Sequence, residues 1–277
     1  MRVCYVKMTE AHGISVANRE RLEALHRRLK GTFSVSEAAA VWSLEATRAR
    51  RLAAYLAARG WLSRVRRDSY TTVPLGATSP KQWREDPWVV GAKTFAPCYL
   101  GGWTACEHWG LTEQIFREMI VFTTRRVRHR QEEIQGTRFR IKVIAAARMF
   151  GWVDVWRAQN QVRVSDPART IVDLLDDPAV GGGMRHVADV LRNYFAGTSR
   201  NDDQLADYAG KIGNRAVFKR LGYLLETLGI NSARLTELCT RRMSTGISLL
   251  DPSGKPTGPI LNRWGLRLNV KLENEAE

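Results

Sequence analysis

Apolar residues recur at intervals of three and four near the start of the chain. Leu22, Leu25 and Leu29 fall on one face of a helix predicted over residues 16–30, which Gly31 ends. Because a stripe of this kind is stable only when it packs on other elements, we expect a small core shared with the segment that follows.

The next segment begins with the signature of a helix start. Ser34 precedes Glu37 by three residues, the spacing at which each side chain bonds a backbone N–H left free at the start of a helix. This capping box predicts a short helix over residues 36–41. A turn at Trp42 and Ser43 follows, so the chain is expected to reverse there.

A second helix is predicted over residues 44–59, with Ser43 as its N-cap and Gly60 at its end. Its apolar positions share one face, which suits packing on the helix before it; they are Ala49, Leu52, Ala53 and Leu56. The polar positions lie largely off that face, and they are Thr47, Arg48, Arg50 and Arg51.

After Gly60 the chain alternates between apolar and basic residues, which predicts a hairpin that turns near Asp68 and Ser69. Its basic residues are Arg64, Arg66 and Arg67. Two helices and a basic hairpin in this order are typical of a winged helix-turn-helix domain. We expect Arg48, Arg50 and Arg51 to enter the major groove of DNA, because a guanidinium can bond both acceptors of a guanine edge. Thr47 is expected to contact a phosphate or a base. The hairpin arginines are expected on phosphates or in the minor groove, where they add affinity.

The rest of the chain predicts a second domain. Pro74, Gly76 and Pro80 indicate a connector, so we expect a DNA-binding domain at residues 1–75, a linker at 76–81 and a larger domain at 82–277. Apolar runs predict strands at 119–124, 139–144, 150–155 and 161–164. Helices are then predicted from Pro167 onward, at about 184–196, 201–209, 214–228 and 232–241, with Asp166 as the first N-cap. The predicted fold class is α+β, with strands first and helices after in a mixed α/β C-terminal domain.

Charge favours a polyanionic partner. The formal net charge of the chain is +15, of which residues 1–75 carry +8. Binding to nucleic acid is therefore expected to weaken as salt rises. The chain has no apolar run of the roughly 20 residues that a membrane-spanning helix needs, and it begins without the apolar core of a signal peptide, so a cytoplasmic location and no membrane partner are expected.

Two further groups of residues have more than one interpretation. A basic run between two predicted strands is either a second nucleic-acid contact or a solvated hairpin, and it consists of Arg125, Arg126, Arg128 and Arg130. Trp103, His108, Trp109 and Gly110 could line a pocket, but aromatic residues beside glycines favour a core. Lys219, Arg220 and Tyr223 are interpreted as the polar face of a helix.

An enzyme is the less favoured alternative. A metal-dependent nuclease needs clustered carboxylates, and Asp154, Asp166, Asp173, Asp176 and Asp177 are available. We interpret Asp166 and Asp173 as a helix cap and a surface residue. The four cysteines lack the spacing of zinc ligands, so no metal, cofactor or catalytic residue is predicted. A docking adaptor that uses a winged helix to bind protein is a third possibility.

Five blocks resemble the AbiEi family, the antitoxin component of type IV AbiE toxin–antitoxin systems. They are Arg-Asp-Ser-Tyr at 67–70, the Gly-Trp-Thr-Ala and His-Trp-Gly-Leu-Thr block at 99–114, Val-Ser-Asp-Pro-Ala-Arg-Thr-Ile-Val-Asp-Leu at 164–174, Lys-Arg-Leu-Gly-Tyr-Leu-Leu-Glu-Thr-Leu-Gly at 219–229 and Asn-Arg-Trp-Gly-Leu-Arg-Leu-Asn at 262–269.

The resemblance implies a sequence-specific transcriptional repressor that binds inverted repeats in double-stranded DNA of its own promoter. It also implies a C-terminal domain that counters a nucleotidyltransferase-like toxin without a need for direct contact. We expect a monomer or weak dimer that binds DNA cooperatively.

Overall fold

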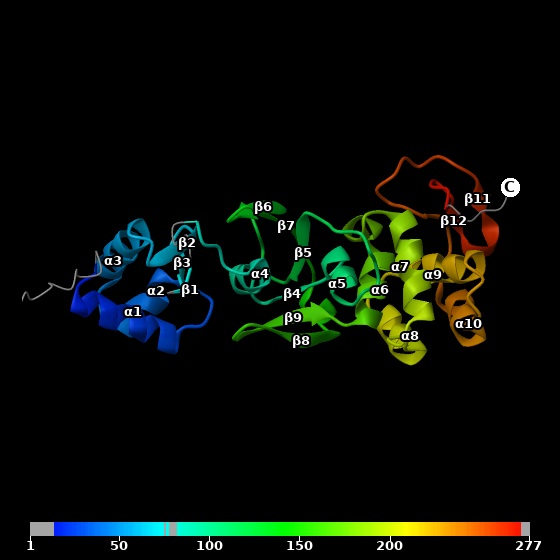
Figure 1. The fold of residues 1–277 in the computed structure, drawn as a ribbon. Helices are drawn as coiled ribbons and strands as arrows, with labels where there is room; N and C mark the ends of the chain where they lie inside the picture. Colours follow the sequence, from blue (N-terminus) through cyan, green and yellow to red (C-terminus); the bar gives the residue numbers. More distant parts are fainter. Residues whose placement is uncertain (1–13, 75, 78–81, 273–277) are drawn as a thin grey trace, which may run out of the picture. The chain divides into compact units, whose positions relative to one another are not determined.

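The computed structural model describes residues 14–74, 76–77 and 82–272. It divides into two compact units, of which the first is Met1–Lys93 with Arg157–Asn160 and the second is the remainder, Thr94–Trp156 and Gln161–Glu277. Figure 1 shows the helices and strands of each unit.

Three helices form most of the first unit. Helix α1 spans Val16–Arg28 behind Ser15, whose side chain accepts from the N–H of Asn18, and it ends two residues earlier than expected. Helix α2 spans Val35–Trp42, and the capping box of Ser34 and Glu37 is present in full. Helix α3 spans Ala46–Ala58 and therefore begins two residues later than expected.

Ser43 does not cap α3 as the sequence predicted. It adopts a left-handed conformation, with φ 53°, and its backbone N–H bonds carbonyls of α2 instead. Ser43 therefore ends α2, and Glu45 occupies the N-cap of α3 without a side-chain bond to the helix. The difference arises because a turn this tight uses a residue at positive φ, whereas an N-cap residue is extended.

A three-stranded antiparallel sheet covers these helices. Its order is β1, β3, β2, where β1 is Thr32–Ser34, β2 is Leu62–Arg66 and β3 is Ser69–Thr72. The predicted hairpin is β2–β3, and Asp68 in its turn has φ 58°. Strand β1 is too short to have been predicted. The shared core includes Leu22, Leu25, Phe33, Ala38, Ala49, Leu56 and Tyr70.

Residues 82–93 belong to the first unit, whereas the sequence placed them in the second domain. Helix α4, at Pro87–Thr94, follows a segment that bonds the small sheet: Ser63 donates to the carbonyl of Trp83 at 3.1 Å, and Thr71 donates to Glu85 at 2.6 Å. The compact unit thus continues past the expected linker at 76–81, of which residues 78–81 lie outside the described residues.

The second unit contains a six-stranded mixed sheet of order β6, β7, β5, β4, β9, β8. The strands are β4 Cys98–Leu100, β5 Glu118–Thr123, β6 Gln131–Ile134, β7 Thr137–Val143, β8 Trp152–Arg157 and β9 Asn160–Ser165. Strands β5 and β7 run parallel, so the chain between them cannot be a simple hairpin. The edge strand β6 completes that connection and forms the hairpin with β7.

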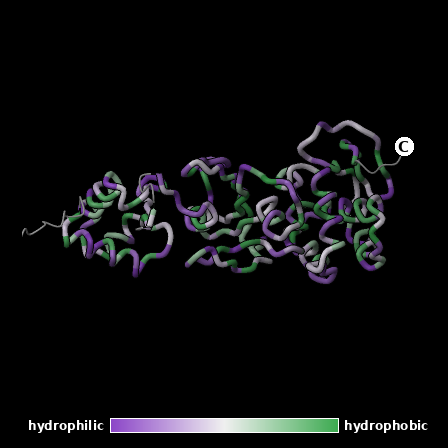
Figure 2. The backbone as a smooth tube through the Cα atoms, in the orientation of Figure 1, coloured by the Kyte–Doolittle hydropathy of each residue, from purple (hydrophilic) through white to green (hydrophobic). Residues whose placement is uncertain are grey.

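Helices of the second unit pack beside this sheet. They are α5 Trp103–His108, α6 Pro167–Asp176, α7 Met184–Ala196, α8 Asp202–Lys211, α9 Ala216–Thr227 and α10 Ala233–Arg242. Helix α6 is central, since it contacts α5, α7, α8 and α9. Asp166 caps it and Pro167 occupies its first turn, as predicted. Figure 2 shows apolar residues along these strands and helices.

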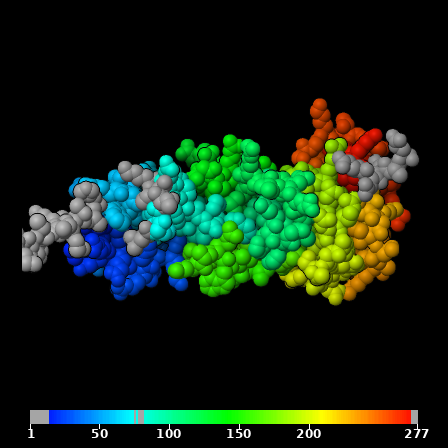
Figure 3. Space-filling view, in the orientation of Figure 1, coloured from blue at the N-terminus to red at the C-terminus, as the bar shows by residue number. Residues whose placement is uncertain are grey.

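The last elements form a small sheet of order β10, β12, β11, with β10 at Ser248–Leu249, β11 at Ile260–Leu261 and β12 at Leu266–Arg267. The loop between β10 and β11 projects from the surface of the second unit (Figure 3). Helices and mixed or antiparallel sheets together give the α+β class that the sequence predicted. In the part of the chain that the structure describes, no helix has the length and apolar character to cross a membrane.

Candidate nucleic-acid interface

Helix α3 presents its polar side chains on the face opposite to the core. Ala49, Ala53 and Leu56 are buried. Since successive residues of a helix are rotated by about 100°, Thr47 and Arg51 point almost directly away from that face, with Arg48 and Arg50 on its two flanks. All four predicted contact residues are exposed. The structure thus places them on one solvent-facing surface.

Arg50 on α3 is joined to Asp68 in the turn of the β2–β3 hairpin. The Nε atom of Arg50 lies 2.8 Å from Oδ1 of Asp68, and Nη2 lies 3.4 Å from Oδ2. This hydrogen bond lowers the pKa of Asp68 and raises that of Arg50. The tip of the basic hairpin therefore lies directly beside the basic helix.

Arg48 and Arg51 differ from Arg50 in their surroundings. Within the described residues, neither forms a hydrogen bond or an ion pair, and both side chains are exposed. Their full charge is consequently presented to solvent. Such arginines are suited to a phosphate or to a base edge.

The hairpin carries the remaining predicted contacts. Arg64, Arg66 and Arg67 are exposed, whereas Leu62, Val65 and Tyr70 are buried. Backbone bonds hold the hairpin in place, because β3 pairs with both β1 and β2 and the carbonyl of Asp68 accepts the N–H of Val35 at 2.9 Å. The basic side chains therefore project from a fixed support.

One aromatic residue of this surface was missed. Tyr55 lies one turn beyond Arg51 on α3, and its side chain is 42% exposed. The guanidinium of Arg59 lies 5.3 Å from the centre of its ring. The sequence signal was available, because Tyr55 is four residues after Arg51 and lies off the apolar face.

The second basic run occupies the connection from β5 to β6. Arg125, Arg126, Arg128 and Arg130 are all exposed. The loop is held at its start by the backbone N–H of Arg125, which donates to the hydroxyl of Thr123 at 3.0 Å. The hairpin interpretation of this run was wrong, because its flanking apolar strands are parallel neighbours. The run remains a candidate for a second contact surface.

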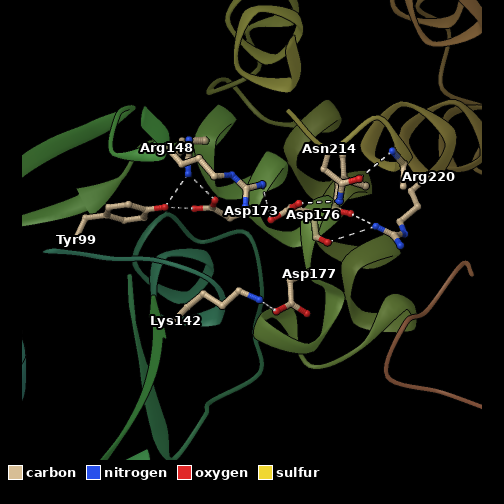
Figure 4. A network of polar contacts seen from close by, with 11 residues as sticks. Tyr99, Lys142, Arg148, Asp173, Asp176, Asp177, Asn214 and Arg220 are labelled. Carbon is tan, nitrogen blue, oxygen red and sulfur yellow. Dashed lines mark hydrogen bonds and ion pairs between the residues drawn. The ribbon is translucent and has the colours of Figure 1, made fainter. Parts of the chain in front are cut away.

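Other charged residues of the second unit are structural. Asp173 is 2% exposed, so its interpretation as a surface residue was wrong. Its carboxylate bonds Arg169 at 3.0 Å and the hydroxyl of Tyr99 at 2.9 Å. Burial raises the pKa of Asp173 to about 6, although Arg169 and Tyr99 oppose that rise. Figure 4 shows Tyr99 pointing toward this carboxylate.

The neighbouring carboxylates at the end of α6 are also paired. Asp176 bonds Arg148 at 2.9 Å and accepts from Asn214 at 2.8 Å, and Asp177 pairs with Lys142 (Figure 4). Among the described residues, no group of three His, Cys, Asp or Glu side chains is placed to hold a metal ion. Cys98, Cys106 and Cys239 are buried free thiols, and Cys4 lies outside the described residues.

Lys219 and Arg220 are buried, so they do not form the polar face of a helix as expected. Lys219 donates to the carbonyls of Gly246 at 2.6 Å and Gly265 at 3.4 Å. Arg220 donates to the carbonyls of Leu175 at 2.7 Å and Leu250 at 3.0 Å. Both side chains therefore hold the segment around the small C-terminal sheet against α9. Tyr223 is buried as well.

The aromatic block at 99–114 is largely core, as the sequence favoured. Trp103 is 5% exposed and stacks on Phe116, with ring centres 4.7 Å apart. Trp109 is partly buried against the main core and donates to the carbonyl of Ser165 at 2.7 Å. Gly110 lies on the surface at φ 64° and His108 is half-buried.

The fold resembles that of the RV2827C protein from Mycobacterium tuberculosis, seen in a crystal structure. The TM-score is 0.66 at 15% sequence identity, and the match covers 92% of this chain and 92% of that chain. No family model matches the sequence. No curated protein matches it either. A likeness at this identity concerns the fold, so it identifies a shared architecture over nearly the whole chain.

Proposed function

We propose that this protein is a transcriptional repressor that binds double-stranded DNA through its first unit, which acts as a winged helix-turn-helix. The observation that carries the proposal is the contact between Arg50 and Asp68. It joins a helix with exposed arginines to a hairpin with exposed arginines, so one continuous basic surface is formed. Helix α2 packs against α3 in the core of the first unit, and the turn at Ser43 follows α2.

The two parts of this surface have different roles in the proposal. Helix α3 enters the major groove, where Thr47 and Arg50 face base edges and Arg48 and Arg51 lie nearer the adjoining phosphates. The hairpin lies along the backbone with Arg64, Arg66 and Arg67, which set affinity and orientation more than sequence preference. Tyr55 adds a flat apolar surface beside the arginines.

The exposed loop between β5 and β6 is proposed as a second electrostatic contact with nucleic acid. Its four arginines lie on a different unit from α3. They would neutralise phosphates without selecting bases, so their contribution falls as salt rises.

The biological setting that we propose comes from the sequence blocks that resemble AbiEi antitoxins. On this basis the protein represses its own toxin–antitoxin operon by binding inverted repeats cooperatively as a monomer or weak dimer. The second unit then acts as a type IV antitoxin against a nucleotidyltransferase-like toxin, and no stable complex between the two is required. Several of the family-like residues, including Tyr99, Asp173 and Lys219, are buried, which assigns them to the fold of that unit.

An electrophoretic mobility shift tests the DNA-binding proposal. The full chain is titrated into the DNA upstream of its gene and into a scrambled duplex of equal length and composition, at several salt concentrations. We expect tighter binding to the upstream DNA and a loss of affinity as salt rises for both. Equal affinity for the two duplexes would contradict a sequence-specific repressor. The antitoxin part is tested separately by co-expression with the neighbouring toxin gene, where restored growth is expected.

A further inference from the structure

Asp68 is the one carboxylate between Ala46 and Val73, a stretch that contains seven arginines. A negative charge at the tip of a DNA-contacting hairpin opposes the approach of phosphate. The position of Asp68 therefore opposes binding to DNA of any sequence.

The carboxylate is not needed to hold the hairpin. Strand β3 is fixed by its pairing with β1 and β2, and the backbone carbonyl of Asp68 bonds the N–H of Val35. The backbone at Asp68 has φ 58°, a conformation that asparagine also adopts readily. The carboxylate of Asp68 is thus not required for the conformation of the hairpin.

Asp68 leaves one edge of the Arg50 guanidinium without a bond to it. A guanidinium has two edges that can bond a pair of acceptors: one is formed by Nε and Nη2, and the other by Nη1 and Nη2. Asp68 occupies the first edge, with contacts of 2.8 and 3.4 Å. The second edge remains, and its geometry matches the O6 and N7 acceptors of guanine.

We propose that Asp68 is a positioning residue that makes Arg50 select guanine in the major groove. The inference rests on the proposed function of the first unit. Asp68 orients the guanidinium, so the open edge is presented in one direction. It also neutralises the charge of Arg50, so this arginine adds little to binding that depends on phosphates alone. Arg48 and Arg51 have no such partner among the described residues, and they serve general affinity.

The experiment measures dissociation constants for the upstream DNA and for scrambled DNA over a range of salt. Four variants of the full chain are compared with the unchanged protein: Asp68→Asn, Arg50→Lys, the double variant of these two, and Arg48→Ala as a matched control. Circular dichroism and urea unfolding verify that each variant is folded.

Asp68→Asn removes a negative charge, so affinity for scrambled DNA rises and its logarithmic salt dependence steepens by about one ion. The preference for upstream DNA falls about 10-fold, because the asparagine amide offers Arg50 one neutral acceptor in place of two charged ones and orients the guanidinium less firmly. Arg50→Lys keeps the charge but lacks the fork, so it loses a similar preference while scrambled binding changes less than about 2-fold. The double variant loses no more preference than Arg50→Lys alone. Arg48→Ala weakens both DNAs alike.

The outcomes separate the two proposals. If the unchanged protein shows no preference for upstream DNA, the repressor proposal fails and the inference falls with it. If the preference exists but survives Asp68→Asn or Arg50→Lys undiminished, the repressor proposal stands and the positioning role of Asp68 is overturned.

Discussion

Tyr99 on β4 and Asp173 on α6 are 74 residues apart in the chain, and the hydroxyl of Tyr99 donates to the carboxylate of Asp173 at 2.9 Å. The same hydroxyl accepts a bond from Arg169 at 2.9 Å. Asp173 and Arg169, both buried on α6, thus share the hydroxyl group of Tyr99, and these bonds connect α6 to β4 of the sheet.

Replacing Tyr99 with phenylalanine removes this shared partner and keeps the ring. We expect the free energy of unfolding to fall by about 1–3 kcal/mol, because the buried carboxylate and guanidinium each lose a hydrogen bond. The pKa of Asp173, which burial already raises to about 6, should rise further. Urea unfolding of the full chain measures the stability. Tyr55→Phe on the exposed face of α3 is the control, and an equal loss in both variants would contradict the role of Tyr99.

Gly222 in α9 is expected to be intolerant of any side chain. A Cβ atom built there lies 2.1 Å from the ring of Trp264, which is 1% exposed and whose indole N–H donates to Glu226 at 2.6 Å. Gly222→Ala should therefore destabilise the protein by about 1–3 kcal/mol or more through overpacking. Gly210 in α8 has no atom within 4 Å of such a Cβ, so Gly210→Ala should be neutral or stabilising. Thermal unfolding measures the melting temperatures of both variants, and equal melting temperatures would refute the packing argument.

Asp251 should contribute stability that depends on pH. Burial raises its pKa, but bonds from Ser253 and from the N–H of Met184 outweigh burial and leave the pKa below its usual 3.8. The folded state therefore holds the ionised form more strongly than the unfolded chain does. This stability is present at neutral pH and is lost as pH falls through the folded value.

Asp251→Asn should accordingly cost about 1–3 kcal/mol at pH 7, and the difference from the unchanged protein should shrink below about pH 4. Urea unfolding at several pH values measures it. A difference that is the same at every pH would show that the charge of Asp251 contributes nothing.

The exposed face of α3 is predicted to be required for DNA recognition and dispensable for folding. Replacing Arg48, Arg50 and Arg51 together with alanine should abolish specific binding, since every side chain removed is exposed. A triple variant of exposed cations elsewhere, Arg241, Arg242 and Lys255, lowers the net charge equally and should retain the preference. Unchanged operator affinity in the α3 variant would refute the assignment.

The arginine loop of the second unit should act on affinity alone. Alanine at Arg125, Arg126, Arg128 and Arg130 is expected to weaken upstream and scrambled DNA by the same factor and to reduce the salt dependence. A mobility shift at several salt concentrations measures both effects. Salt dependence equal to that of the unchanged protein would mean that this loop does not meet phosphates.

The sequence predicted correctly those features that depend on a few neighbouring residues, namely helix caps and turns. The capping box of Ser34 and Glu37, the cap at Asp166 and the hairpin turn at Asp68 each depend on neighbours within a few residues, and all were predicted. Exposure of the arginines on α3 followed from helical periodicity.

Charged residues inside the second unit were beyond such rules. Asp173, Lys219 and Arg220 look like surface residues in sequence but are buried. Lys219 and Arg220 bond carbonyls of distant segments, and Asp173 bonds the distant Tyr99 besides Arg169 on its own helix. Strand β6 was missed for a related reason, since its glutamates show no apolar pattern and only its pairing with β7 makes it a strand. The pairing of Arg50 with Asp68 likewise joins residues 18 apart, and no local pattern signals it.

The carbonyl groups that receive Lys219 and Arg220 have a consequence for how the protein is made. Gly246, Ser248 and Gly265 are translated after α9, so Lys219 leaves the ribosome before any of its acceptors exist. Arg220 already has the carbonyl of Leu175, but its acceptor at Leu250 also follows later. The ammonium group of Lys219 therefore lacks its acceptors until residues 246–265 have followed α9. We therefore expect the packing around Lys219 to be completed late, after residues 246–265 have been made.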